Sequence, residues 1–353
     1  MGVGGPPALL KAGKAAIMGK SPLPGVGGDR RMAAGRCAVV GAGNIDIGGF
    51  PREAVVPGDS IPGRVALSAG GVGRNIACNA ARLALETHLV AAFGTDPFAD
   101  ILRRDLSRAG VHTDLCLTFE GARSSCYLYV TDPRGEMLAA VNDMDLCLRM
   151  TPEALSGRMD ALDAMDLVVL DANLPSDTLL SLAGRLHPPL IADAVSAVKA
   201  HRLRPILPRL QAIKVNALEA RALTGIDAGC PKGAAAAARA LVAMGTKQVY
   251  LTLGSAGACC ADERGTWLLP CPATRTVNVT GAGDAFAAAL VWAHLSGLDT
   301  PNTALAGLAA AALTVEAPGT VAPGLSPAAL TERIAAMSPA PSSKEEESRE
   351  QTS

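Results

Sequence analysis

Short apolar runs alternate with helical patterns along most of this chain. Six runs are apolar nearly throughout instead of alternating with polar residues, which is typical of strands buried on both faces of a parallel sheet. These runs are 37–42, 88–93, 166–170, 189–193, 211–215 and 248–253. Amphipathic helical patterns lie at 75–85, 99–109, 234–244 and 284–295, the last three ended by a glycine. Repeated strand–helix units predict an α/β fold with a doubly wound, mostly parallel sheet.

Two stretches break this alternation. Short strand patterns without an intervening helix fall within about 47–68 and 119–145. In the second stretch, Tyr127 and Tyr129 alternate at period two before a turn signal at 132–135. These stretches predict a small antiparallel sheet that is separate from the main one and covers a site as a lid.

The two ends differ from the body in composition. Residues 1–35 are rich in Gly, Pro, Ala and basic residues, with Asp29 as the single acid, and 338–353 are polar and charged. We interpret both as disordered tails and 36–337 as the folded domain. A mitochondrial transit segment at 1–35 is the alternative, so the expected location is cytoplasmic unless that segment is cleaved.

Composition and net charge indicate which classes of partner and ligand to expect. Hydrophobic residues make up 49%, and 32 basic against 33 acidic residues give a net charge of -1. We therefore expect no nucleic-acid partner, and no membrane partner because no long uncharged apolar stretch is present. Aromatic residues are only 3%, so any base would be recognised mainly by hydrogen bonds and apolar packing. Nine cysteines without a CxxC pair indicate reduced core residues.

The segment 278–286, NVTGAGDAF, contains the strongest candidates for catalytic residues. Gly281 and Gly283 allow a tight turn whose N–H groups, together with the start of the following helix, form a site for a phosphoryl oxyanion. A carboxylate at Asp284 is suited to be the general base that takes the proton of an attacking hydroxyl. Capping of the helix by Asp284 is the structural alternative.

Three further segments carry candidate ligand contacts. Asn44 and Asp46 follow the first strand and are suited to sugar hydroxyls, while an aspartate where GxGxxG needs its last glycine argues against a dinucleotide site. The glycine-rich 70–75, GGVGRN, is either a hinge with Asn75 reaching a ligand hydroxyl or a plain helix entry. Asn216 and Glu219 lie on one helical face and could position a hydrated Mg²⁺ near nucleotide phosphates.

These four segments, in this order, resemble the ribokinase (PfkB) family of carbohydrate and nucleoside kinases over about residues 36–335. The resemblance implies a three-layer α/β/α body with a small β-sheet lid, and an ATP-dependent kinase. It implies that Asp284 is the catalytic base and that Gly281, Ala282 and Gly283 form the anion hole. It further implies that ATP and Mg²⁺ are held by Asn216, Glu219, Thr252, Gly254 and Gly257, with Glu219 contacting Mg²⁺ through water.

Within the family, the sequence motifs of this chain are most similar to those of the pseudouridine kinases. The shared runs include GGVGRNIA at 70–77, NDM at 142–144 and NVTGAGDA at 278–285. The implied reaction is transfer of phosphate from ATP to the 5′-hydroxyl of pseudouridine. The implied substrate-binding residues are Asn44, Asp46, Gly70, Gly71, Arg74, Asn75, Ser124, Asp143 and Asn173. A kinase for another nucleoside or sugar (ribose, adenosine or fructose) and a non-catalytic ligand-binding relative are the alternatives.

Two family properties are left open by the residues. Many sugar kinases of the family have Asp where this chain has Asn278, and that Asp usually helps to bind a monovalent cation, so a role for K⁺ is an open question. Lids of this kind often pair across a two-fold axis, which leads us to expect a homodimer.

Overall fold

The computed structural model describes residues 35–337. The predicted tails 1–35 and 338–353, and with them the transit interpretation, lie outside this range except for Gly35. The strands are β1 (Arg36–Val40), β2 (Asn44–Pro51), β3 (Gly63–Gly70), β4 (Glu86–Val90), β5 (Ala92–Phe93), β6 (Leu117–Thr118), β7 (Cys126–Thr131), β8 (Met137–Asp143), β9 (Leu167–Asp171), β10 (Leu190–Asp193), β11 (Ala212–Asn216), β12 (Gln248–Thr252), β13 (Ala258–Asp262) and β14 (Gly265–Leu269).

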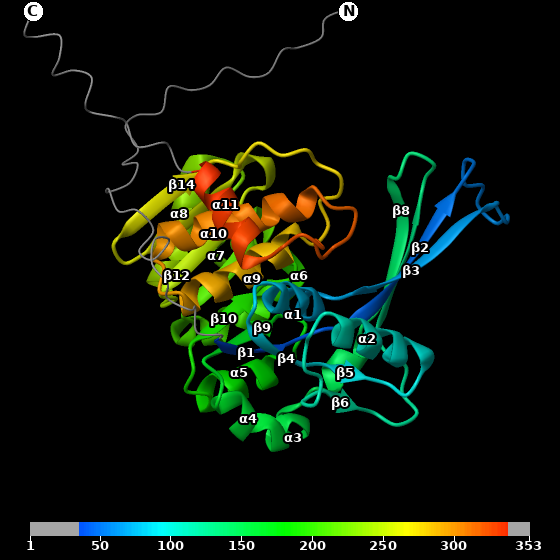
Figure 1. Ribbon diagram of the computed structural model, residues 1–353, viewed down its shortest axis with the longest axis horizontal. Coiled ribbons are helices and arrows are strands. Elements are labelled where there is room, and N and C mark those ends of the chain that lie inside the picture. The colour runs from blue at the N-terminus through cyan, green and yellow to red at the C-terminus, as the bar shows by residue number, and fades with distance from the viewer. Residues whose placement is uncertain (1–34, 338–353) are drawn as a thin grey trace, which may run out of the picture. The chain divides into compact units, whose positions relative to one another are not determined.

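The helices follow the strands along the chain (Figure 1). The α-helices are α1 (Val72–Arg82), α2 (Pro97–Arg108), α3 (Pro152–Leu155), α4 (Met159–Asp163), α5 (Ser176–Arg185), α6 (Ala197–Ala200), α7 (Ala217–Thr224), α8 (Pro231–Ala243), α9 (Ala282–Leu295), α10 (Thr300–Val315) and α11 (Pro327–Met337). The 3₁₀ helices are η1 (Asp145–Arg149), η2 (Ser156–Arg158), η3 (His201–Arg209) and η4 (Gly254–Ala256). Within 35–337, no helix is long and apolar enough to span a membrane.

An eight-stranded sheet forms the centre of the fold, in the order β14-β13-β12-β11-β10-β9-β1-β4. The six strands from β12 to β4 in that order run parallel, which confirms the predicted α/β class. β13 and β14 extend the sheet in antiparallel fashion, a hairpin that the sequence pattern did not predict. The ends of the parallel strands therefore meet along one edge, where ligands bind in such folds.

Helices cover both faces of this sheet. On one face, Ala38, Val168 and Ile213 belong to a core that includes buried residues of α5, α7 and α8. On the other face, α1, α9 and α10 pack together, and the ring centroid of Tyr250 lies 6.5 Å from that of Phe286 on α9. The result is the three-layer α/β/α body expected from the family resemblance. Six of the nine cysteines are buried in it, whereas Cys126 and Cys271 are partly exposed and Cys230 is exposed.

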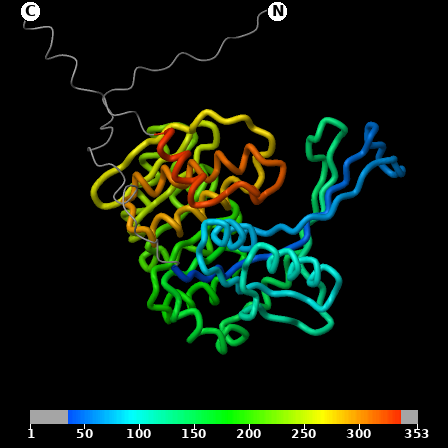
Figure 2. The backbone as a smooth tube through the Cα atoms, in the orientation of Figure 1, coloured from blue at the N-terminus to red at the C-terminus, as the bar shows by residue number. Residues whose placement is uncertain are grey.

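A second sheet has the order β3-β2-β7-β8 and is called the lid sheet below. It is mixed and not antiparallel throughout as predicted, because two antiparallel hairpins join through the parallel pair β2–β7. β2 begins only four residues after β1 ends, so the central strand of the body leads directly into the lid sheet. The tube in Figure 2 follows this path, with the β2–β3 and β7–β8 hairpins extending beyond α1 and α2. Every residue of β8 is exposed, so this strand has no layer of structure over either face.

The strand register divides the lid sheet into two faces, because residues paired across strands point to the same side. Asp46, Ser68, Tyr127 and Asn142 form one cross-strand row, which defines the inner face. The neighbouring row of Ile47, Leu67, Leu128 and Val141 lies on the opposite side, which we call the outer face. The inner face is polar and aromatic near the body, while the outer face is apolar.

Candidate active site at the carboxyl edge of the sheet

Three charged residues lie side by side where β9, β10 and β11 approach their carboxyl ends. Asp193 pairs in register with Asp171 on one side and with Lys214 on the other. All three side chains belong to buried residues, and Lys214 Nζ lies 3.1 Å from Asp193 Oδ2. Burial by itself lowers the pKa of Lys214, but Asp193, Glu219 and Asp284 together raise that pKa above its usual value. The row therefore keeps a buried positive charge at this edge.

The start of α9 faces this row. Gly281 is the N-cap residue with φ of 85°, and a Cβ at this position would collide with the carbonyl oxygen of Thr320. Glycine is required there because L side chains are disfavoured at positive φ. A Cβ on Gly283 would lie 2.9 Å from Lys214 Nζ, so the ammonium group lies against the first turn of the helix. Free N–H groups, the helix dipole and a lysine thus converge on one point, an arrangement suited to an anion.

Asp284 lies in the same turn, but Gly281 and not Asp284 occupies the N-cap position. Its Oδ2 accepts a 2.8 Å hydrogen bond from Asn75 Nδ2. Burial and the carboxylates of Asp193 and Asp171 raise the pKa of Asp284 to about 7, while Lys214 and the Asn75 hydrogen bond oppose the shift. A carboxyl group with this pKa exchanges protons near neutral pH, as a general base requires.

Asn75 is itself held by its neighbours on α1 and beyond. Its Oδ1 accepts a 2.8 Å bond from Arg74 Nη1 and a 3.4 Å bond from Thr320 Oγ1. Arg74 in turn forms an ion pair with Asp105 on α2. With its oxygen occupied by donors, the Asn75 amide can present only its NH₂ group to Asp284, which orients the carboxylate.

The predicted sugar-binding residues gather at the junction of the body and the lid sheet. Asn44 pairs in register with Gly70, and Asn44 Nδ2 donates a 2.7 Å hydrogen bond to Asp46 Oδ1. Gly71 adopts φ of 99°, where a Cβ would lie 2.9 Å from Asn44 Oδ1. Burial raises the pKa of Asp46, while Asn44 and Arg74 act to lower it. The sequence-distant segments 44–46 and 70–75 therefore form one cluster.

A cavity of about 1430 Å³ opens beside this cluster. It is lined on one side by the lid sheet, chiefly by inner-face residues together with Leu67 and Ala69 of the edge strand β3, and on the other by α1, α2 and the loops 277–280 and 318–321. Asp46, Arg74 and Thr320 line it, whereas Asp284 does not and is reached from it through Asn75. The cavity is thus linked to Asp284 by the hydrogen bonds of Thr320 and Asn75.

The low aromatic content predicted a pocket short of rings, but this cavity contains three. Phe50, Tyr127 and Tyr129 all line the cavity from the inner face of the lid sheet. The ring centroids of Tyr127 and Tyr129 are 5.8 Å apart, and Phe50 meets Tyr129 edge-on at 5.9 Å. Only ten aromatic residues occur in the chain, and period two places three of them on one surface. Composition could not reveal this clustering.

Three other predicted substrate-binding residues, Ser124, Asp143 and Asn173, do not line the cavity. Ser124 is buried, and its hydroxyl donates to Asp96 Oδ1 at 2.7 Å and accepts from the Gly94 N–H at 3.0 Å. The strand register places Asp143 on the outer face of the lid sheet, whereas Asp46 is on the inner face. Asn173 follows β9 and is buried, with its Oδ1 accepting a 2.6 Å bond from Lys199.

The predicted nucleotide-binding residues lie at the ends of β11 and β12. Asn216 and Thr252 are paired across these strands. Asn216 caps α7 in a reciprocal capping box with Glu219, in which both carboxylate oxygens accept from Asn216 at 2.7 and 2.8 Å. Gly254 begins the short η4 turn after β12 and Gly257 follows it, both at positive φ.

Asn278 also has defined partners. Its Nδ2 donates a 3.0 Å bond to the carbonyl oxygen of Pro318, and its Oδ1 accepts a 3.0 Å bond from the Thr280 N–H. The amide therefore links two loops that border the cavity.

Sequence reasoning did not single out the charged row of Asp171, Asp193 and Lys214, nor the inner-face position of Asn142. Lys214 interrupts an apolar strand, AIKVN, and a charge inside a buried strand is a signal that could have been used. Asp171 and Asp193 each end an apolar strand, which is the same signal. Asn142 is distinguished from Asp143 only by the register of β8 with β7, which no single-strand pattern contains.

Comparisons with known proteins show the family of this chain. The family model described as pfkB family carbohydrate kinase matches residues 34–327. The pseudouridine kinase of Escherichia coli is 34% identical over 263 residues, which cover 74% of this chain and 84% of that protein.

Solved structures show the same fold. A carbohydrate kinase from Agrobacterium tumefaciens is 31% identical, with a TM-score of 0.77 over 86% of this chain and 98% of that one. Arabidopsis thaliana ribokinase, solved with ribose and ATP, has a TM-score of 0.77 at 22% identity, over 85% of this chain and 99% of that one. This chain belongs to the pfkB family of carbohydrate kinases.

Proposed function

We propose that this chain transfers the γ-phosphoryl group of ATP to the 5′-hydroxyl of pseudouridine, giving pseudouridine 5′-phosphate and ADP. The observation that carries the proposal is Asp284 in the first turn of α9, hydrogen bonded to Asn75 of α1, with Lys214 against the same turn. The similarity of this chain to the Escherichia coli pseudouridine kinase supports the choice of substrate.

In the proposed mechanism, Asp284 accepts the proton of the 5′-hydroxyl as its oxygen bonds to the γ-phosphorus and ADP leaves. The N–H groups at Gly281–Gly283 and the positive end of α9 stabilise the negative charge of the transferring group. Lys214 adds a fixed positive charge beside Gly283. Because phosphoryl transfer depends chiefly on positioning and electrostatics, these groups account for most of the expected catalysis.

The sugar and base would occupy the cavity on the other side of Asn75. We assign the ribose hydroxyls to Asp46 and Asn44, whose carboxylate and amide offer both acceptors and donors. The aromatic surface of Phe50, Tyr127 and Tyr129 offers a stacking platform that a free sugar would not need. Asn142, in register beside Tyr127, could hydrogen bond to the edge of the base.

We place ATP at Asn216, Glu219, Thr252, Gly254 and Gly257. Arabidopsis ribokinase, which shares this fold, was solved with ATP. Glu219 is buried and uses both carboxylate oxygens in its bonds to Asn216, so the residues fit a hydrated Mg²⁺ held through water and not a directly ligated ion. Bound Mg²⁺ would offset phosphate charge, while Asn216 and Glu219 position its water shell.

A substrate panel tests the proposal. The purified protein is given ATP and Mg²⁺ with pseudouridine, uridine, adenosine, ribose or fructose, and kcat/KM is measured for each. We expect pseudouridine to have the highest value. Preference for another substrate would replace the assignment within the family. Absence of turnover with every member, together with binding of a nucleoside in calorimetry, would favour a non-catalytic relative.

A further inference from the structure

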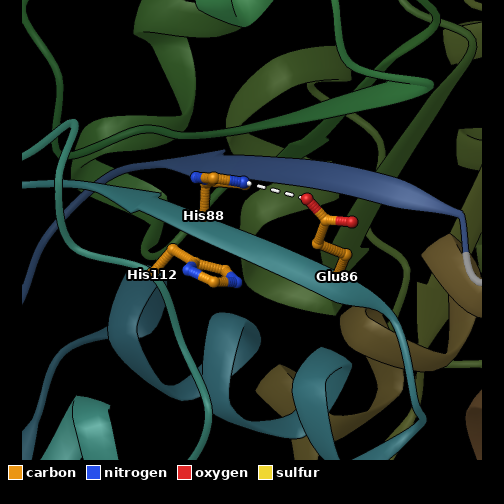
Figure 3. Close-up of side chains that lie close together, drawn as sticks. All are labelled: Glu86, His88 and His112. Carbon is orange, nitrogen blue, oxygen red and sulfur yellow. Dashed lines mark ion pairs between the residues drawn. The ribbon is translucent and has the colours of Figure 1, made fainter.

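A cluster of metal-ligating side chains lies at the β4 edge of the main sheet, apart from the kinase site. Glu86, His88 and His112 each direct a ligand atom into one volume, with these atoms all within 4.8 Å of one another. Figure 3 shows Glu86 and His88 facing each other from one strand, with His112 beside them on the neighbouring segment. Glu86, His88 and His112 are not among the residues that line the cavity described above.

The backbone brings these three residues together. Glu86 and His88 are two apart on β4, so their side chains leave the same face of the strand. His112 lies opposite His88 in a parallel β-bridge. The His112 N–H donates to Thr87 O and its carbonyl accepts from Leu89 N, both at 2.9 Å. Because each position is fixed by main-chain bonds, only side-chain rotation is needed to adjust the donors.

His88 is also held from its other side. Its Nδ1 lies 3.4 Å from Asp114 Oδ1, and its Nε2 lies 3.6 Å from Glu86 Oε1. A carboxylate behind one ring nitrogen, with the other nitrogen facing a second ligand, is the usual arrangement of a metal-binding histidine. The His88 side chain is 15% exposed, so its orientation is constrained by packing.

The charges around the cluster favour a cation. Glu86 and Asp114 are ion-paired only to His88 among the residues that the structure describes. The nearest strand partner of Glu86, Arg36, directs its guanidinium to the Ala164 carbonyl. Two carboxylates beside two imidazoles therefore leave a negative site. Imidazole ligands select borderline transition metals, while Mg²⁺ prefers oxygen alone.

We propose that His88, His112 and Glu86 bind a Zn²⁺ ion, with Asp114 orienting His88 and water completing a four-coordinate site. The rings of His88 and His112 are stacked with centroids 4.7 Å apart and planes 23° from parallel. One ring must leave the stack to share a metal, and His112 is exposed, so it has room to turn. A bound ion would clamp the segment after α2 to the sheet edge.

Zinc titration of the full-length, untagged chain tests this site. After chelator treatment, isothermal calorimetry with ZnCl₂, and separately with MgCl₂, is run on the wild type, on His88→Ala/His112→Ala and on His187→Ala. His187 is the matched control because it is an exposed histidine beside a carboxylate, Asp163. All three proteins keep the nine cysteines, so binding to thiols cancels in the comparison.

We expect the double variant to lose one zinc equivalent that the wild type and His187→Ala retain. Asp114→Asn should weaken zinc binding by about 10- to 100-fold. Because the Asp114 side chain is exposed, we expect this variant to fold, so it tests the site even if the double variant does not fold. Equal zinc stoichiometry and affinity in all variants would overturn the proposal, as would equal binding of Mg²⁺ at this site.

Discussion

At the scale of single residues, the proposed chemistry depends on carboxylates that are buried close together. Asp284 is near Asp193 and Asp171, and burial raises its pKa to about 7. Since the folded-state pKa lies above the unfolded value, ionising Asp284 opposes folding, and its contribution to stability is lost as pH rises toward 7. The protein tolerates this cost where a base of near-neutral pKa is useful.

Asp284→Asn should lower kcat by on the order of 10² or more, because general-base catalysis contributes roughly 10²–10⁴-fold. In the wild type, kcat/KM should fall as pH decreases below about 7, since the protonated carboxyl cannot accept a proton. Steady-state kinetics from pH 5.5 to 9 measure both effects. The variant should be at least as stable as the wild type at pH 8, which serves as its folding control. Near-normal activity in the variant would remove Asp284 as base.

Lys214 is the second residue whose role can be separated from folding. Lys214→Met leaves Asp193 buried without its ion-pair partner, which should reduce stability by about 3–5 kcal/mol. The double variant Lys214→Met/Asp193→Asn removes that unpaired charge and should recover much of the stability. If Lys214 stabilises the transferring phosphoryl group, kcat should remain reduced by about 10²–10³-fold in both. Activity that returns with stability would show that Lys214 is only structural.

At the scale of elements, the lid sheet separates two surfaces by alternation alone. Neighbouring residues of β7 point to opposite sides, Tyr127 toward the cavity and Leu128 toward the outer face. The pattern explains how a chain with 3% aromatic residues still presents a ring surface to a ligand. A one-residue shift of register would exchange the two surfaces, so the β2–β7 pairing specifies the pocket.

Tyr127→Ala should raise KM for the nucleoside by about 5- to 150-fold, because stacking contributes about 1–3 kcal/mol per base. The KM for ribose, if ribose is turned over, should change little. Leu128→Ala is the matched control on the same strand but the outer face, and its nucleoside KM should stay close to the wild-type value. Equal effects of both substitutions, or equal effects on ribose, would contradict a stacking role for Tyr127.

At the scale of the whole molecule, the outer face of the lid sheet is an exposed apolar surface. Val65, Leu67, Leu128 and Val141 share that side and are 69%, 53%, 43% and 66% exposed. Contiguous exposed apolar surface of this kind commonly marks an interface. A second copy of the same face is the partner we propose, since two-fold contacts are self-complementary.

Val65→Lys/Val141→Lys should convert a homodimer into a monomer, because two charges would be buried without partners at the interface. Light scattering after size exclusion at micromolar concentration measures the mass, expected near twice 35.8 kDa for the wild type. Val198→Lys is the control, since Val198 is 80% exposed on α6, away from the lid sheet. A monomeric wild type at all concentrations would exclude the dimer.

Local signals determined much of this protein without its structure. Apolar runs and helical periods are properties of neighbouring residues, so they predicted the α/β class, and the glycines of GAGD predicted a turn opening a helix, which Gly281 and α9 confirm. The Asn216–Glu219 spacing predicted two residues on one helical face, but Asn216 ends β11 and caps α7 from outside the helix, where it forms a capping box with Glu219.

Tertiary structure decided what depends on neighbours across strands. The row of Asp171, Asp193 and Lys214 exists only because β9, β10 and β11 lie in register, and residues far apart in sequence share a site only through that pairing. The same is true of Tyr127 with Asn142, and of His88 with His112. Composition counts residues without locating them, which is why it predicted a pocket poor in rings where the fold gathers three.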